Sequence, residues 1–330
     1  MTVELIKDRD IWDGFVDESS YGSICHKWDF LHIIEKYTGH TLYRYGVYKN
    51  EALMAVMPVF VNKIHGLTTV SSPPPQTAVP SLGPVLYKDF IHQKQNKKET
   101  QLTMVVEELN AIMEELSPNW LFVSLVPEFR DIRPFIRWNN YSYDIRFYYL
   151  IDTRRPIDEI YMGFTNRLRR SLNKAESLDL RIEKSDDASP LYEQLQKSYD
   201  RQQRRIPIPN ADYLNELLRT FPDELGAYYL YNSDEVMIGA TIVQEYKRLV
   251  GWIGIPKFDE ISYGNEYLIW KMIEKAKTEN YRWFEFVGAG TRNLHPFMAK
   301  YNPSLEMAFE VYKQDIFGKG ATWLYKTLYK

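Results

Sequence analysis

Two ionisable side chains in residues 281–304 are placed where they can do chemistry. Lys300 stands between aromatic and turn residues in "HPFMAKYNPS", and its ammonium can meet a phosphate or a carbonyl oxygen. Glu285 lies in "WFEFV", where the two phenylalanines share one strand face and the carboxylate points to the other, so it can serve as a general base. A solvated turn and a solvated strand face would explain the same residues without chemistry.

Basic side chains gather at two further places, and arginine forks suit phosphate groups. The expected helix 161–176 carries the first group on one face; its members are Arg167, Arg170 and Lys174. The second group ends a helix before a proline-stiffened loop in "DRQQRRIPIP"; its members are Arg201, Arg204 and Arg205. A solvated helix face is the competing interpretation, and the sequence favours it for the first group.

Metal, redox and serine-hydrolase chemistry find no support in the sequence. A single cysteine, Cys25, leaves no internal disulfide and suits a cytosolic chain. No Gly-x-Ser-x-Gly nucleophile elbow occurs, and the histidines fall in no metal-ligand spacing. They are His26, His32, His40, His65, His92 and His295. We therefore expect no bound metal.

The charge balance limits the classes of partner. The 330 residues carry 41 basic and 44 acidic side chains, for a formal net charge of −3. This balance excludes a general nucleic-acid binder and makes any phosphate site local. The N-terminus lacks a signal-peptide pattern, and no apolar run approaches membrane-spanning length. The sequence therefore predicts a soluble cytoplasmic protein with no transmembrane segment and no DNA partner.

The elements that position these residues form two similar series. Residues 41–70 predict three strands separated by polar turns, and residues 227–255 repeat the pattern. An amphipathic helix follows each meander, with its apolar side chains on one stripe. Each helix is expected to pack on a sheet.

The segments after these helices align with each other without a gap. They are "NWLFVSLVPEFRDIRPFIRWNNYS" and "YRWFEFVGAGTRNLHPFMAKYNPS". The alignment pairs Asn140 with Asn302 and Trp138 with Lys300. Agreement in the order of elements across both halves favours a diverged tandem repeat over chance similarity of two strand–turn segments.

The repeat predicts two domains, 1–150 and 151–330, because an array of this length used twice places the domain break near its middle. Only the second copy has a polar side chain at the position of Lys300. We therefore expect the chemistry in 151–330, with 1–150 as a degenerate copy that completes the cleft.

The order of elements in the second half resembles the GNAT N-acyltransferase fold. The sequence predicts helix 156–176, strand 179–184, helices 187–204 and 210–220, a three-strand meander, helix 264–279, strand 281–287, a helical turn near 293–300 and strand 304–312. Doubled in one chain, the series resembles the FemAB-like group, including BioF2-like acetyltransferases. The motifs that carry this resemblance are "FTNRLRRSLNKAESLDLRIEKSDD", "RRIPIP", "GATIVQEYKRLVGWIGIPKFDEISYGNEYLIWKMIEKAKTENYRWFEFVGAG" and "FMAKYNP". The resemblance implies an α/β fold with mixed sheets in two tandem GNAT-like domains.

The resemblance implies a donor side for the site. In FemAB-like proteins a Phe/Lys segment lies in the transfer cleft, and Lys300 is the matching position, although Phe297 precedes it by three residues. Tyr263, Gly264 and Asn265 would line the donor site, with an ordinary helix start as the alternative. A coenzyme A loop reads Arg/Gln-x-x-Gly-x-Gly/Ala, and "KFDEISYGNEYL" supplies only one glycine. The FemAB-like group commonly lacks that loop.

The resemblance also implies an acceptor side. Because "RRIPIP" is similar to the group's acceptor-side loop, substrate-binding roles are expected for Arg201, Arg204 and Arg205. Trp252 would stack on a substrate or pack in the core. Glu285 would join Lys300 as the catalytic residues.

The implied activity is N-acyl transfer. An acyl-CoA or an aminoacyl-tRNA would serve as co-substrate, with no resident cofactor, and the acceptor would be an amine of a small molecule or a cell-envelope precursor. The alternative is a non-catalytic tandem-GNAT module that binds a nucleotide-linked ligand or a partner protein; loss of the glycine loop favours this alternative.

Overall fold

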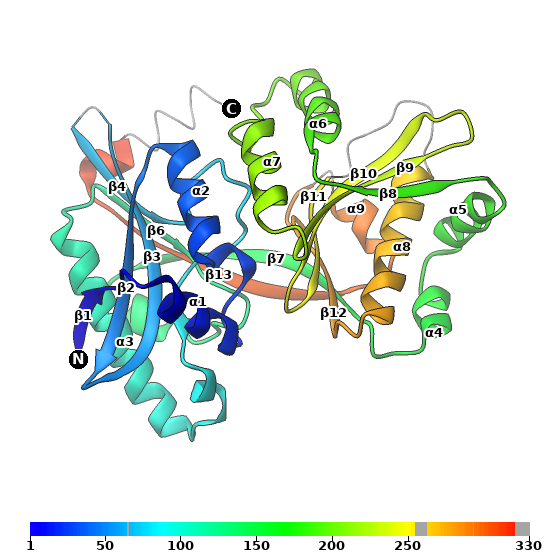
Figure 1. Cartoon of the computed structure of the whole chain (residues 1–330). Helices are drawn as coiled ribbons and strands as arrows, with labels where there is room; N and C mark the ends of the chain where they lie inside the picture. Colours follow the sequence, from blue (N-terminus) through cyan, green and yellow to red (C-terminus); the bar gives the residue numbers. More distant parts are fainter. Residues whose placement is uncertain (65, 255–262, 293, 321–330) are drawn as a thin grey trace. The chain divides into compact units, whose positions relative to one another are not determined.

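Figure 1 shows a computed structural model of the chain, which describes residues 1–64, 66–254, 263–292 and 294–320. The chain divides into two units. The first contains Met1–Arg146 and the chain from Ala308 on, and the second contains Phe147–Met307. Among the described residues, no helix combines the length and the apolarity needed to cross a lipid bilayer.

The first unit is built on one mixed sheet with strand order β1-β2-β3-β4-β6-β13. Strands β4 and β6 run parallel, and the other neighbours run antiparallel. The strands are β1 (Thr2–Leu5), β2 (Thr41–Lys49), β3 (Ala52–Ile64), β4 (Leu67–Ser72), β5 (Val85–Leu86, paired with β3), β6 (Trp120–Ser124) and β13 (Ser304–Gln314). The main helices are α1 (Arg9–Glu18), α2 (Trp28–Thr38) and α3 (Gln95–Glu115), with short helical turns at Ile24–His26, Lys88–His92 and Pro134–Trp138.

The second unit has a sheet of the same design, with strand order β7-β12-β11-β10-β9-β8. Strands β11 and β12 are the parallel pair. The strands are β7 (Ser142–Asp152), β8 (Arg181–Ser185), β9 (Leu225–Tyr231), β10 (Met237–Glu245), β11 (Leu249–Gly254) and β12 (Trp283–Phe286). The helices are α4 (Ile157–Met162), α5 (Asn166–Glu176), α6 (Ser189–Arg201), α7 (Ala211–Thr220), α8 (Gly264–Thr278) and α9 (His295–Ala299).

Both predicted meanders and both predicted packing helices are present, so the tandem fold is confirmed. The two copies agree down to single residues: β7 begins at Ser142 and β13 at Ser304, which the ungapped alignment pairs. Asn140 and Asn302 both adopt left-handed backbone angles, with φ of 57° and 52°. Asparagine tolerates this conformation better than most residues. The shared turn geometry therefore explains why asparagine stands at both aligned positions.

The last strand of each sheet comes from the other copy. β7 follows β6 in the sequence but pairs with β12, with Ile151 opposite Phe284. β13 follows β12 but pairs with β6, with Val311 opposite Val123. The two sheets therefore exchange equivalent strands.

The helix expected over 156–176 is interrupted. α4 ends at Met162, and α5 begins after Thr165, whose side chain accepts a hydrogen bond from the Leu168 N–H. This N-cap satisfies one of the free donors at the start of a new helix. The prediction of one continuous helix is wrong because apolar periodicity continues across a break that a local cap produces.

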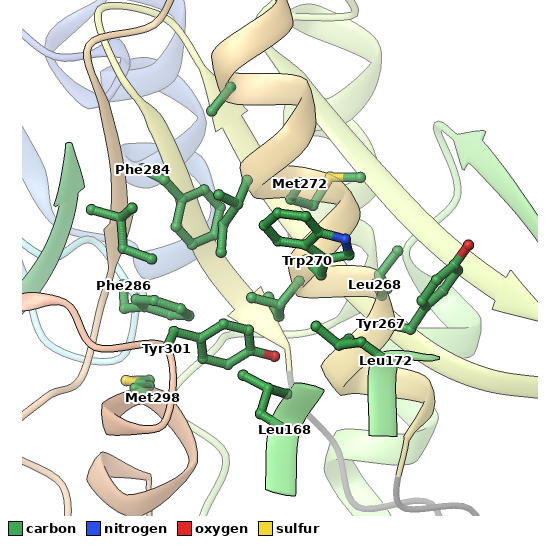
Figure 2. Close-up of a cluster of buried hydrophobic side chains, with 14 of the residues drawn as sticks. Leu168, Leu172, Tyr267, Leu268, Trp270, Met272, Phe284, Phe286, Met298 and Tyr301 are labelled. Atoms are coloured by element: carbon green, nitrogen blue, oxygen red, sulfur yellow. The ribbon is translucent and has the colours of Figure 1, made fainter. Parts of the chain in front are cut away.

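The core of the second unit lies under α8. Leucine, isoleucine and methionine side chains on one stripe of α8 pack against Phe284 and Phe286 of β12 and against Leu168 and Leu172 of α5, as Figure 2 shows. Each such side chain, when fully buried, stabilises the fold by about 1.5–3 kcal/mol. Side chains of α5, α8 and the strands, including Tyr228 of β9, belong to this one buried cluster.

Candidate transfer site

The parallel strands of the second unit separate near their carboxyl ends. The pairs between β11 and β12 join Leu249, Val250 and Gly251 to Phe284, Glu285 and Phe286. Beyond these pairs β12 ends, whereas β11 continues to Gly254, which lies opposite Thr241 of β10. Ligands of α/β sheets commonly bind at the carboxyl ends of parallel strands.

The equivalent place in the first unit is closed. β4 pairs with β6 up to Ser72, opposite Val123. The Leu82 and Gly83 N–H groups then donate to the Ser124 carbonyl oxygen at 2.9 and 3.0 Å. The loop that contains these two residues therefore covers the end of β6. In the second copy, the described residues show no equivalent pair of hydrogen bonds to the end of β12.

Lys300 directly follows α9. Its ammonium donates a hydrogen bond to the Glu266 carboxylate on α8 and lies 4.0 Å from the ring centroid of Phe297. Its carbonyl oxygen accepts a hydrogen bond from the Thr165 N–H at 3.0 Å. Burial lowers the pKa of Lys300, the Glu266 carboxylate opposes that change, and the charge of Arg167 lowers the pKa further. The lysine predicted from the sequence is therefore a mostly buried cation with a fixed partner.

Tyr301 ties the lysine segment to α8 and to the core. Its hydroxyl donates to the Glu266 carbonyl oxygen at 2.9 Å. Its ring contacts Phe286, at the end of β12, with 5.4 Å between centroids. Figure 2 shows the ring beside Phe286, Met298 and Leu168. Burial raises the pKa of Tyr301 well above its ordinary value, so the hydroxyl stays a donor.

Glu285 lies on the other side of β12. Its neighbours Phe284 and Phe286 point into the α8 core, and successive side chains of a strand point to opposite faces. The Glu285 carboxylate is 7% exposed as a residue and accepts a hydrogen bond from Arg248 at 2.7 Å. No contact described in the structure joins Glu285 to Lys300, and the ion pair with Arg248 gives Glu285 a structural explanation.

Packing accounts for two of the three residues expected at the donor site. A Cβ on Gly264 would lie 1.9 Å from the Ile238 carbonyl oxygen, so only glycine lets α8 begin this close to β10. The Asn265 side-chain oxygen accepts a hydrogen bond from the Ala240 N–H at 3.2 Å. Tyr263 lies with its ring 5.6 Å from the Lys174 ammonium. Residues 255–262, which carry the rest of the segment compared with a coenzyme A loop, lie outside the described residues.

The residues expected on the acceptor side have two different environments. Arg204 and Arg205 are exposed in the turn after α6, and neither forms an ion pair in the described part of the chain. Arg201 is the exposed last residue of α6. Trp252 is 6% exposed on β11, which supports its alternative role as a core residue.

The basic face of α5 extends from the lysine to the start of α8. Arg167 is close enough to affect the pKa of Lys300, and Lys174 lies against Tyr263. Arg167 and Arg170 are exposed and form no ion pair with any residue that the structure describes. Lys271 of α8, by contrast, is paired with Glu176 at 2.8 Å. The α5 face is therefore free to meet an external anion.

Two residues of the site, Glu266 and Tyr301, are not singled out by the sequence. Glu266 is an acid in the first turn of a helix, which is common for reasons of helix stability alone. Tyr301 reads as one more aromatic residue. The fold brings Glu266 to Lys300, and it directs the hydroxyl of the neighbouring Tyr301 to the backbone of the same residue.

Comparison with known proteins agrees with this geometry. Residues 163–295 match the family model of an acetyltransferase (GNAT) domain. The fold is similar to that of FemX, with a TM-score of 0.71, 10% identity and 100% of both chains covered. It is also similar to the C-terminal domain of a putative lysylphosphatidylglycerol synthetase from Agrobacterium fabrum, with a TM-score of 0.58, 11% identity, and 96% of this chain and 95% of that chain covered.

A third similar structure is L-PGS from Bacillus licheniformis, with a TM-score of 0.56, 12% identity, and 98% of this chain and 97% of that chain covered. No curated protein matches the sequence significantly. At these identities the structures show the fold alone, while the family model covers most of the second unit. Residues 163–295 are therefore similar to a GNAT acetyltransferase domain, and the whole chain has a tandem fold similar to that of FemX, as the sequence predicts.

Proposed function

We propose that the chain is an N-acyltransferase of the FemAB-like or BioF2-like type, with its transfer site in residues 151–330. The observation that carries the proposal is Lys300, a mostly buried cation that is held by Glu266 of α8 and whose neighbour Tyr301 packs against Phe286 at the end of β12. The match of 163–295 to an acetyltransferase domain supports the reaction class. A buried cation suits a site where negative charge develops on an acyl oxygen.

In the proposed reaction, the nitrogen of the acceptor amine attacks the acyl carbonyl carbon. The new C–N bond forms, and the bond from that carbon to the donor oxygen or sulfur breaks. Lys300 would stabilise the negative charge on the carbonyl oxygen and on the leaving group. The amine must also lose a proton, which either Glu285 or the leaving group would take. Because Glu285 lies on the opposite strand face and pairs with Arg248, its role as base is the weaker part of this proposal.

We propose an acyl-CoA or an aminoacyl-tRNA as the co-substrate. Both donors carry phosphate. Arg167 and Arg170 of α5 are exposed and form no ion pair with a described residue, which supports an anionic donor beside Lys300. The donor site would also include Tyr263 beside Lys174. Either donor is compatible with the packing roles of Gly264 and Asn265.

The acceptor in this proposal is an amine of a small molecule or a cell-envelope precursor. Arg204 and Arg205 are exposed without ion-pair partners among the described residues, so they can bind a phosphate of a nucleotide-linked acceptor, together with Arg201 at the end of the same helix. A cytoplasmic location is part of the proposal; it is supported by the single cysteine, Cys25, which leaves no internal disulfide.

A second candidate is a non-catalytic module that binds a nucleotide-linked ligand or a partner protein. The observation in its favour is that packing against β10 explains Gly264 and Asn265 without any ligand. A binder of this type would depend on its arginines and would not depend on Lys300.

Product analysis separates the two candidates. The protein would be incubated with acetyl-CoA or with charged tRNA and a panel of amines, and acylated amines would be detected by mass spectrometry. Lys300→Met and Glu285→Gln would be compared with Glu176→Gln, which removes an ion pair of the same unit away from the site. Products from the wild type and from Glu176→Gln, with loss in Lys300→Met, would support transfer. Donor or acceptor binding without any product would support the binding module.

A further inference from the structure

The carboxylate that holds Lys300 belongs to a residue with few alternative positions. Glu266 lies in the first turn of α8, two residues after Gly264. Gly264 packs against the β10 backbone so closely that no other side chain fits there. The start of α8 is therefore fixed, and Glu266 is fixed with it. The helix dipole also favours a carboxylate in this turn.

Several contacts converge on the same two residues. The Glu266 carboxylate accepts from the Lys300 ammonium, and the Glu266 carbonyl oxygen accepts from the Tyr301 hydroxyl. On its other side, Lys300 covers the ring of Phe297, and its carbonyl oxygen accepts from the Thr165 N–H. Backbone and side chain of the lysine are thus held separately, and among the described residues Glu266 alone holds the charged end through a carboxylate.

Stability alone is a poor explanation for this ion pair. The Lys300 and Glu266 side chains are 19% and 12% exposed, so both charges have lost most of their hydration. Such buried pairs gain little net stability, because the cost of desolvation offsets the attraction between the charges. The pair between Lys271 of α8 and Glu176 of α5 is more exposed, at 27% and 49%. It serves as a matched reference.

We propose that Glu266 is a positioning residue that holds the Lys300 ammonium in the orientation used for acyl transfer. This inference rests on the proposed function. A lysine side chain has a flexible four-carbon stem, so an unanchored ammonium would sample many positions around the reacting carbonyl. Misplacement by about 1 Å can cost about 100-fold in rate. Glu266 restricts that freedom without touching the substrate.

The proposal has a consequence for the charge state of Lys300. The charged and titratable groups that face it are Glu266 from α8, Arg167 from α5 and the neighbouring Tyr301. Burial and Arg167 lower the pKa of Lys300, and Glu266 raises it. Removing the carboxylate therefore lowers the pKa further, and the ammonium loses its proton at a lower pH.

Direct titration of Lys300 tests the anchor without any assay of activity. The protein would be labelled selectively with 13C,15N-lysine, and the Lys300 side-chain resonance would be assigned with Lys300→Arg. We expect Glu266→Gln to move the Lys300 titration to lower pH and to broaden or shift its resonance, whereas Glu176→Gln leaves it unchanged. An unchanged Lys300 titration in a folded Glu266→Gln protein would overturn the inference.

Kinetics test the role in transfer. We expect Glu266→Gln to lower kcat by about 10- to 100-fold with little change in KM for the donor, to move the alkaline limb of the kcat profile to lower pH, and to add little when combined with Lys300→Met. Glu266→Asp keeps the charge and should restore the position of the alkaline limb while kcat stays reduced. Full activity in a folded Glu266→Gln protein would contradict the positioning role.

The two proposals can fail separately. A wild-type protein that transfers no acyl group from either donor, but whose Lys300 titration still moves in Glu266→Gln, would overturn the proposed function and leave Glu266 as the anchor of Lys300. Activity that is lost in Lys300→Met but retained in Glu266→Gln would support the proposed function and overturn the positioning role of Glu266.

Discussion

Individual residues of the site owe their identity to close packing as much as to chemistry. Gly264 is conspicuous in the sequence as the only glycine of a candidate phosphate loop, yet its neighbour in the structure is the Ile238 carbonyl oxygen. Lys300, by contrast, reads as an ordinary surface lysine and is mostly buried. Sequence identifies the type of group at a position, but the surroundings that decide its role come from segments distant in the chain.

Replacing Gly264 by alanine is expected to destabilise the second unit. The added Cβ would overlap with backbone atoms of β10, and overpacking of this kind costs about 1–3 kcal/mol in the free energy of unfolding, sometimes more. Urea denaturation of Gly264→Ala would measure the loss.

The control is Gly14→Ala, in the exposed part of α1, where nothing lies within 4 Å of the added Cβ. This change should raise stability slightly, by about 0.5–1 kcal/mol, because alanine suits a helix interior better. Equal changes in the free energy of unfolding in the two variants would contradict the close approach of α8 to β10.

The pH dependence of transfer should report the charge of Lys300. A lysine is protonated below its pKa, and burial together with Arg167 lowers this pKa from its ordinary value. If the ammonium is the active form, activity is lost as the pH rises through a value lower than that of a free lysine, about 10.4.

Removing the positive charge in Arg167→Gln raises the pKa of Lys300, so the alkaline limb of the kcat profile should move to higher pH. Arg170→Gln, one turn further along α5, is the control. A limb that stays in place in Arg167→Gln would show that another group titrates there.

At the level of elements, periodic patterns predict most of what is observed. The two meanders and the stripe of α8 are evident in the sequence because apolar residues alternate in strands and recur every three or four residues in helices. The break between α4 and α5 is not evident, because it depends on the Thr165 cap. The pairing of Glu266 with Lys300 is not evident either, because the two residues are joined only by the packing of α9 against α8.

The basic face of α5 should contribute to binding of an anionic donor. Replacing Arg170 and Lys174 by glutamine removes two exposed charges, and the change should weaken donor binding and make it less sensitive to salt, because fewer phosphate contacts release fewer counterions. Calorimetric titrations at low and moderate salt would measure both effects.

A matched pair of exposed charges elsewhere in the same unit, Lys247 and Arg282, provides the control variants. Equal loss of affinity in the control would indicate a general charge effect, and unchanged affinity in the α5 variant would remove α5 from the donor site.

At the level of the whole molecule, the repeat is visible in the sequence but the exchange of strands is not. The alignment places the break near 150, whereas the units are Met1–Arg146 with the chain from Ala308 on, and Phe147–Met307. β7 and β13 start at equivalent residues, so a sequence pattern cannot tell which of the two completes which sheet. The fully buried Val311 of β13 aligns with the larger Tyr149 of β7, and this difference in size distinguishes the two strands.

The exchange predicts that residues 1–150 do not form a stable unit alone. The fragment lacks β13, so β6 loses a neighbouring strand and the core loses Val311. Thermal unfolding followed by circular dichroism should show no cooperative transition. The same fragment with 304–314 in place of 142–150 restores β13 and should regain one. A cooperative transition in the unmodified fragment would contradict the exchange.

Binding of acyl donors tests the central claim most directly. Purified protein would be titrated calorimetrically with acetyl-CoA, a longer acyl-CoA, charged tRNA and uncharged tRNA, alongside Lys300→Ala. The account predicts saturable binding of at least one donor and weaker binding of that donor to Lys300→Ala. A folded protein that binds none of them, or that binds a donor equally well without Lys300, would contradict an acyl-transfer site at this lysine.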